Sequence, residues 1–285
     1  MTRSLMLVAL LALSLPQTLW AQTPAAATST GAASTAVQGD DPDMDPNDAQ
    51  PDFFVSTIPT TLRLPRNKMT FRLTHRFARA LGQGDAGELF ENFFGFDSGA
   101  VMGVGLSYGV VRGGQVSVYR TSDRTIQFAG LYEILNQQRA PVGAAVVVNV
   151  DGTNNFRDSY SPGVQLVVSR ELGSRGALYA APSYVNNSSP DPGELVDDND
   201  TIMMGLGARL RVRRNTYLVL EGSPRLGGYA PGTALVAFGV EQRAGGHLFQ
   251  LTFSNGLGTT LAQVARGGTS KDDWYIGFNL SRKFY

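Results

Sequence analysis

The strongest constraint on this chain is a two-residue alternation of apolar with small or polar side chains, which recurs from residue 67 to the last residue. In the final segment, Asp273–Tyr285, every even-numbered position from 274 to 284 is apolar except Arg282. A β-strand places alternate side chains on opposite faces, so this segment predicts one apolar and one polar face. Residues 274 to 284 would rise about 33 Å, and a tilt of about 40° leaves about 25 Å, the height of the apolar band of an outer-membrane barrel.

The same alternation predicts twelve strands, with short and long connections following one another. The strands are Lys68–Phe77, Ala100–Val110, Gln115–Arg120, Thr125–Leu135, Pro141–Val150, Gly163–Arg170, Ala177–Val185, Thr201–Arg213, Thr216–Gly222, Thr233–Gln242, His247–Asn255 and Asp273–Tyr285. Only Thr121–Arg124 is short where a long loop is expected, and outer-membrane barrels show this division. We therefore predict an all-β fold over residues 67–285, a closed antiparallel up-and-down transmembrane β-barrel of about twelve strands.

The residues before the barrel divide into three segments. Arg3 followed by an apolar run predicts a signal peptide over residues 1–21, too short to span a bilayer as a helix. Residues 22–52 carry six Asp and no Lys or Arg, which predicts a disordered acidic tail. Residues 53–66 are more apolar but are broken by Pro59 and Pro65, so they form either a small plug or a lead-in to the first strand. An even number of strands then places both termini in the periplasm of a bacterial cell with an outer membrane.

Composition excludes several classes of function. The absence of cysteine rules out disulfides, thiolate metal sites, a cysteine nucleophile and a lipoprotein anchor. Basic residues are scattered among acidic ones and the net charge is zero, so nucleic acid is not an expected partner. We expect no cofactor and no metal. The expected partners are outer-membrane lipid, the machinery that inserts barrels and, through the 22–52 tail, a periplasmic protein.

The two histidines do not predict a catalytic site. His75 falls near the outer rim and His247 at the periplasmic start of a strand, so most of the membrane thickness should separate them. Both share the parity of lipid-facing residues. Outer-membrane phospholipases carry Ser two positions from the catalytic His, whereas this chain has Phe77 and Phe249 at those positions. We therefore expect that the protein is not an enzyme.

Three motifs go beyond general barrel character: Phe71-x-x-x-His75-Arg76-Phe77, Gly245-Gly246-His247-x-Phe249-Gln250-Leu251 and Ile276-Gly277-Phe278-Asn279-x-Ser281-Arg282. With these motifs, the chain from Lys68 to Tyr285 resembles a family of uncharacterised bacterial outer-membrane β-barrel proteins, known only as a domain of unknown function. The resemblance implies an outer-membrane barrel and supplies no activity. The motif residues without an assigned role are His75, Arg76, Phe77, His247, Asn279 and Arg282.

Charged side chains on the inner parity are the candidate functional residues. They are Arg72, Arg76, Arg209, Arg211, Arg213, Glu133, Glu221 and Glu241. A ladder of arginines would favour anionic solutes in an open lumen, whereas Arg–Glu pairs would satisfy one another in a filled one. We expect a non-enzymatic barrel that acts as a narrow passive channel or transporter for a small solute. The alternative is a structural or docking barrel whose acidic tail binds a periplasmic partner.

Overall fold

The computed structural model describes residues 47–91, 99–189 and 199–285, and these ranges contain thirteen β-strands, two short α-helices and one 3-10 turn at Gly173–Arg175. The strands are β1 (Met69–Phe77), β2 (Ala100–Val111), β3 (Gly114–Thr121), β4 (Ile126–Leu135), β5 (Gly143–Gly152), β6 (Tyr160–Glu171), β7 (Gly176–Val185), β8 (Thr201–Arg213), β9 (Thr216–Ser223), β10 (Arg225–Gly228), β11 (Leu235–Ala244), β12 (His247–Ser254) and β13 (Tyr275–Phe284). The helices are α1 (Ala86–Glu91) and α2 (Leu261–Arg266).

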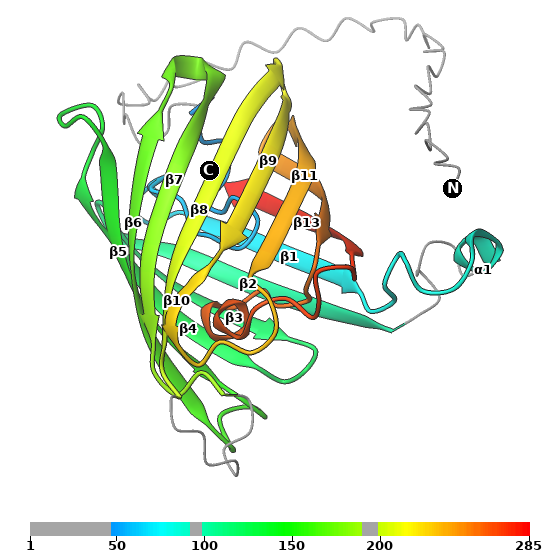
Figure 1. The fold of residues 1–285 in the computed structure, drawn as a ribbon. Coiled ribbons are helices and arrows are strands. Elements are labelled where there is room, and N and C mark those ends of the chain that lie inside the picture. The colour runs from blue at the N-terminus through cyan, green and yellow to red at the C-terminus, as the bar shows by residue number, and fades with distance from the viewer. Residues whose placement is uncertain (1–46, 92–98, 190–198) are drawn as a thin grey trace, which may run out of the picture. The chain divides into compact units, whose positions relative to one another are not determined.

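Twelve of these strands close into an antiparallel barrel, because each pairs with its neighbours along the chain and β13 pairs with β1 (Figure 1). In the closing pair, Phe278 lies opposite His75 and Leu280 opposite Leu73. The predicted fold class and the predicted closure are confirmed. The thirteenth strand, β10, follows Pro224 in a stretch expected to be loop, and it pairs with β8 as a continuation of the β9 arm. Proline has no N–H to donate, so it separates the two pieces of this arm.

Alternation along each strand separates an apolar outer face from a small or polar inner face. On β2, Met102, Val104 and Leu106 are exposed, while the intervening Gly103 and Gly105 are buried. Comparable apolar side chains are exposed on every long strand from β2 to β12, apart from β5, where the structure exposes mainly Val148. A belt of this kind is unfavourable in water, whereas the hydrocarbon of a bilayer solvates it.

The inner-face glycines of β2 make room for an aromatic ring. A Cβ atom added at Gly103 would lie 1.8 Å from the Tyr119 hydroxyl oxygen. Because that space is free, Tyr119 lies across the inner wall and its hydroxyl contacts Thr74 at 2.5 Å and Thr259 at 3.0 Å. The small residues therefore let one ring connect β1, β3 and the loop after β12.

The two ends of the barrel differ. We call one the short-turn end, where two to seven residues join β2 to β3, β4 to β5, β6 to β7, β8 to β9 and β11 to β12. At the other, the long-loop end, the connections run to Ala78–Gly99, Asn186–Asp200 and Asn255–Trp274, while the β3–β4 and β5–β6 connections are short. No helix in the described part of the chain is long and apolar enough to cross a bilayer.

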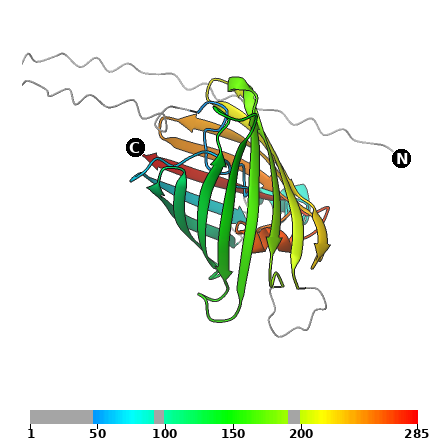
Figure 2. The same cartoon turned by 90° about the vertical axis from the view of Figure 1, so that its left-hand side faces the viewer.

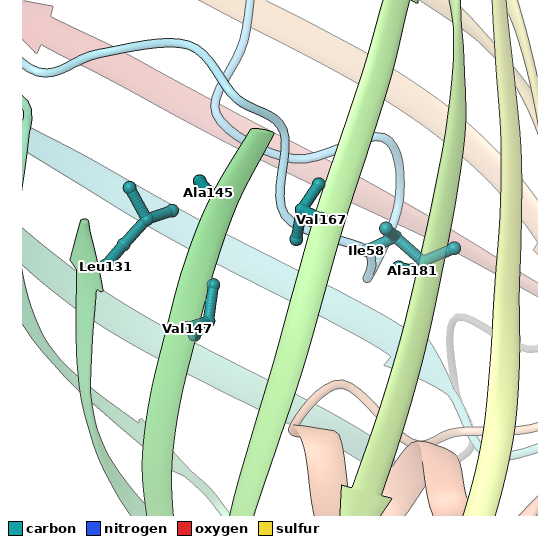
Figure 3. Close-up of a cluster of buried hydrophobic side chains, with 6 residues drawn as sticks. All are labelled: Ile58, Leu131, Ala145, Val147, Val167 and Ala181. Atoms are coloured by element: carbon teal, nitrogen blue, oxygen red, sulfur yellow. The ribbon is translucent and has the colours of Figure 1, made fainter. Parts of the chain in front are cut away.

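Residues 47–65, which we call the plug, pass through the barrel interior (blue in Figures 1 and 2). Ile58 of the plug packs against Leu131, Ala145, Val167 and other apolar side chains on the inner wall of β4 to β7 (Figure 3). Packing begins earlier than the sequence suggests. The expectation that residues 22–52 form a disordered tail is wrong for residues 47–52, of which 49–52 are buried.

The physical reason for this correction is that aspartate in this stretch has partners inside the barrel. Ser281 of β13 donates a hydrogen bond of 2.9 Å to the Asp52 carboxylate, and Asp48 pairs with two arginines described below. An acidic composition alone therefore does not indicate disorder when the facing wall is basic and hydroxylated. Residues 1–21 and 22–46 of the predicted signal peptide and tail lie outside the described residues.

Helix α2 occupies the barrel interior near the long-loop end, against β5, β6, β7 and β8. Thr260 and Gln263 form a reciprocal capping box at its start, and the Ala262 N–H donates to Asp151 at 3.1 Å. Its Ala262, Val264 and Ala265 pack with Val185, Met203 and Leu235. Burial lowers the pKa of the Arg266 guanidinium in its last turn. Sequence periodicity did not predict this helix.

Candidate functional site

Charged side chains gather on one half of the inner wall. Arg72 and Arg76 on β1, Arg209 on β8, Glu221 on β9 and Glu241 on β11 are all buried. These strands follow one another around the barrel as β8, β9, β11, β12, β13 and β1. The two-residue alternation thus brings residues more than 130 positions apart in the sequence onto one continuous polar surface.

Arg209, Glu241 and Arg76 are linked by a chain of hydrogen bonds that runs from β8 to β1, while Arg209 Nε, Glu241 Oε1 and Arg76 Nη2 have no hydrogen-bond partner among the described residues. Arg209 Nη2 and Glu241 Oε2 form an ion pair of 2.9 Å, and both side chains are 0% exposed. The chain continues from Glu241 through Gln250 at 3.1 Å and Asn279 at 2.6 Å to Arg76 at 2.8 Å. Linked buried hydrogen bonds of this kind strengthen one another and hold a surface rigid. This part of the wall matches the interpretation in which Arg and Glu satisfy each other.

The plug makes a tight turn next to this surface. Phe54 and Pro59 form an antiparallel bridge, and the Val55 N–H donates to the Ile58 carbonyl at 2.9 Å. We call residues 54–58 the plug tip. Because the chain turns back here, several of its backbone N–H and C=O groups point away from the plug and need partners on the wall.

The wall binds the backbone of the plug tip through both its acceptors and its donors. Three successive tip carbonyls each accept a hydrogen bond of 2.6 Å from a wall side chain. The pairs are Phe54 with Arg209 Nη2, Val55 with Gln250 Nε2 and Ser56 with Arg72 Nη2.

Glu221, a negatively charged residue, binds the backbone N–H groups of the plug tip. Its carboxylate accepts hydrogen bonds from the backbone N–H groups of Ser56, Thr57 and Ile58 at 2.9, 2.9 and 3.1 Å, and from the Thr57 hydroxyl. Charge-assisted hydrogen bonds are stronger than neutral ones, so Glu221, Arg72 and Arg209 together hold the tip by its backbone.

The plug is also tied at the short-turn end of the barrel. Asp48 bridges Arg211 at 2.9 Å and Arg243 at 3.1 Å, and Arg63 pairs with Glu133 at 3.2 Å. Two cavities of about 410 and 510 Å³ open at this end, and Asn47 lines both. The predicted inner-wall residues Arg211 and Glu133 therefore lie at the mouth of the barrel, where they hold the two ends of the plug.

A further cavity of about 50 Å³ lies between the plug and α2. Its lining is mixed, with Ile58 and Leu261 on the apolar side and Gln127 and Gln165 among the polar residues. Gln115 Oε1 and Asn149 Oδ1, from two other lining residues, are buried without a hydrogen-bond partner among the described residues. A polar space of this size has room for a few water molecules.

The remaining predicted residues lie away from the polar surface. Arg213 is exposed at the β8–β9 turn, beyond a register shift that follows Arg211. Arg282 is exposed on the outer parity, with its guanidinium 5.1 Å from the centre of the Phe284 ring.

The histidines lie on the outer side of the barrel. The His75 ring stacks on Phe278 at 4.9 Å and lies 4.3 Å from the Phe77 ring, and His247 is exposed. They flank β13 opposite Phe278 and Arg282, which are four positions apart, or about 13 Å along a strand. The expected separation by most of the membrane thickness is therefore too large, because His75 lies opposite Phe278, near the middle of β13, and not at the outer rim.

The comparisons with known proteins agree with this architecture. Residues 52–284 match the family model described as a membrane bound beta barrel domain (DUF5777). The chain belongs to this family. Among solved structures, a NanC porin matches at 9% identity with a TM-score of 0.50, covering 76% of this chain and 99% of that one. A triple mutant of Rhodopseudomonas blastica porin matches at 11% identity with a TM-score of 0.34, covering 70% of this chain and 58% of that one. A search of curated proteins gives no match.

The NanC porin likeness shows a porin-like fold, and the family match makes this chain a membrane β-barrel. The contacts that sequence reasoning missed are those of the plug. Gln250 lies in a quoted motif, but its partner is the Val55 backbone carbonyl, which no side-chain pattern can reveal. The sequence feature that could have identified these two residues is strand alternation, which places Gln250 and Asn279 on the inner face beside the predicted charges.

Proposed function

We propose that this protein is a passive channel of the bacterial outer membrane for small polar solutes, and that the plug closes its lumen in the state described here. Both termini are periplasmic in this proposal, so the short-turn end faces the periplasm and the long-loop end faces outward. The likeness to a NanC porin and the even number of barrel strands support this orientation and class.

One observation carries the proposal: the plug tip is held mainly by hydrogen bonds from its backbone to charged and polar wall residues. Water can replace hydrogen bonds of this kind when the plug leaves. The side chains of Arg72, Arg209 and Glu221, which are buried while the plug is in place, would then be exposed and hydrated. A barrel built only as a solid structural element would fill the same space with apolar side chains, at less risk of unpaired charge. A twelve-stranded barrel is also wider than the eight-stranded barrels that side chains fill completely.

Planar-bilayer recording tests the proposal. A variant without residues 47–63 should conduct ions strongly, and the full-length chain should show low or intermittent conductance. Full-length Glu221→Gln should conduct more often than the parent, because the plug tip loses a charged acceptor for three N–H groups. Asp158→Asn, on an exposed loop, is the matched control and should resemble the parent.

Folding of each variant is checked by the shift in electrophoretic mobility between unheated and boiled samples. If all the variants fold and insert, yet the deletion and Glu221→Gln both fail to conduct, the protein is not a channel.

A further inference from the structure

The plug tip is bound as a peptide would be bound, through features that are common to all peptides. Three consecutive carbonyls face Arg209, Gln250 and Arg72, and three consecutive N–H groups face Glu221. A wall that recognises backbone acceptors and donors does not depend on which side chains the segment carries.

The wall also provides places for two side chains of the tip. Val55 packs with Ala177, Tyr179 and Val219. Ile58 packs with a separate group on β4 to β7, which includes Val147 and Ala181 (Figure 3). These two apolar groups, beside the polar contacts, fit a short chain with aliphatic side chains.

We propose that the same wall binds short peptides with aliphatic side chains as its solutes, and that the plug tip occupies their site as an internal mimic. This inference rests on the proposed channel function and names its solute class. A simple anion would satisfy the arginines but leave Glu221 unpaired. A sugar can pair with charges of both signs through its hydroxyls, but it does not present three successive carbonyls beside three successive N–H groups. A peptide supplies acceptors and donors together, in the order that the wall already matches.

Competition in the full-length protein tests this proposal. The chain has no cysteine, so Val55→Cys introduces one thiol at a position that is 1% exposed. A water-soluble maleimide should label this thiol only when the plug tip leaves the wall. The tetrapeptide with the sequence of residues 55–58, blocked at both ends, should raise the labelling rate to a plateau, whereas sucrose and succinate at equal concentration should not.

Two further variants define the outcome. Asn215→Cys, in the β8–β9 turn, should be labelled at a rate that the peptide does not change. Adding Glu221→Gln to Val55→Cys should raise the labelling rate in the absence of peptide. It should also raise, by about tenfold, the peptide concentration that gives half of the maximal increase in labelling rate, because the site has lost a charged acceptor. If Glu221→Gln speeds labelling but the peptide has no effect beyond that of sucrose, the peptide site does not exist.

A second measurement separates this proposal from the channel proposal. Binding of the fluorescein-labelled tetrapeptide to the barrel without residues 47–63, in detergent, is followed by fluorescence anisotropy. Binding without conductance would overturn the channel and keep the peptide site. Conductance without binding, or without any block of the current by the peptide, would overturn the peptide site and keep the channel.

Discussion

Arg209 divides its hydrogen bonds between the barrel and the plug. One guanidinium nitrogen contacts both Glu241 at 2.9 Å and the Phe54 carbonyl at 2.6 Å, and the side chain is fully buried. A buried charge is tolerated only when its partners replace water, so Arg209 and Glu241 are a unit. Whether a single arginine stabilises the barrel or the closed plug can therefore be read only from variants that change one partner at a time.

At this scale we predict that Arg209→Met alone destabilises the barrel by about 3–5 kcal/mol, because Glu241 is left buried without its cation. The double variant Arg209→Met with Glu241→Leu should cost clearly less than the sum of the two single changes, because neither charge remains. Reversible urea unfolding in lipid vesicles measures these free energies. Arg213→Ala, exposed on the same strand, is the control and should change stability by less than about 0.5 kcal/mol. Strict additivity of the two single variants would contradict the coupling.

Among the elements, the strands were predictable, whereas helix α2 and the contacts of the plug were not, for a physical reason. Each strand carries its own evidence, because the lipid selects apolar side chains at every second position regardless of distant contacts. Helix α2 spans only six residues, too few for a helical period, and its Ala262 and Ala265 are buried by strands far away in the sequence. The polar contacts of the plug tip are made by its backbone groups, which every residue has, so no side-chain pattern signals them.

Helix α2 gives a second prediction, on its capping box. Thr260→Ala removes the side-chain acceptor of the Gln263 N–H and should cost the helix about 1 kcal/mol. Hydrogen exchange at residues 262–266 should then be about fivefold faster, while exchange in the strand ladders stays unchanged. Thr269→Ala, exposed in the same connection, should leave both regions as in the parent. Unchanged exchange in α2 after Thr260→Ala would show that packing against β5 to β8 alone determines the helix.

On the scale of the whole molecule, the boundary between the tail and the plug decides how the channel and docking hypotheses are tested. Composition alone suggests a deletion of residues 22–52 to test the tail. That deletion would also remove Asp48 and Asp52. Their contacts hold the plug to Arg211, Arg243 and Ser281. Such a deletion would alter the gate and the tail together. A deletion that ends at residue 46 leaves every described plug contact in place.

We therefore predict that the chain without residues 22–46, behind its own signal peptide, inserts and shows the low conductance of the full-length chain. Extending the deletion to residue 52 should raise the fraction of time spent open. The plug then loses two ion pairs at the short-turn end, one hydrogen bond to β13 and the hydrogen bonds of Asn47 and Gln50 to Glu171. Paired planar-bilayer recordings of the two deletions measure this difference, with Asp48→Asn in the full-length chain as an intermediate case. A deletion of residues 22–46 that by itself opens the lumen would show that the tail, rather than the plug contacts described here, keeps it closed. Equal conductance in both deletions would show that the contacts of Asp48 and Asp52 do not hold the gate, and would leave Glu221, Arg72 and Arg209 as the groups that do.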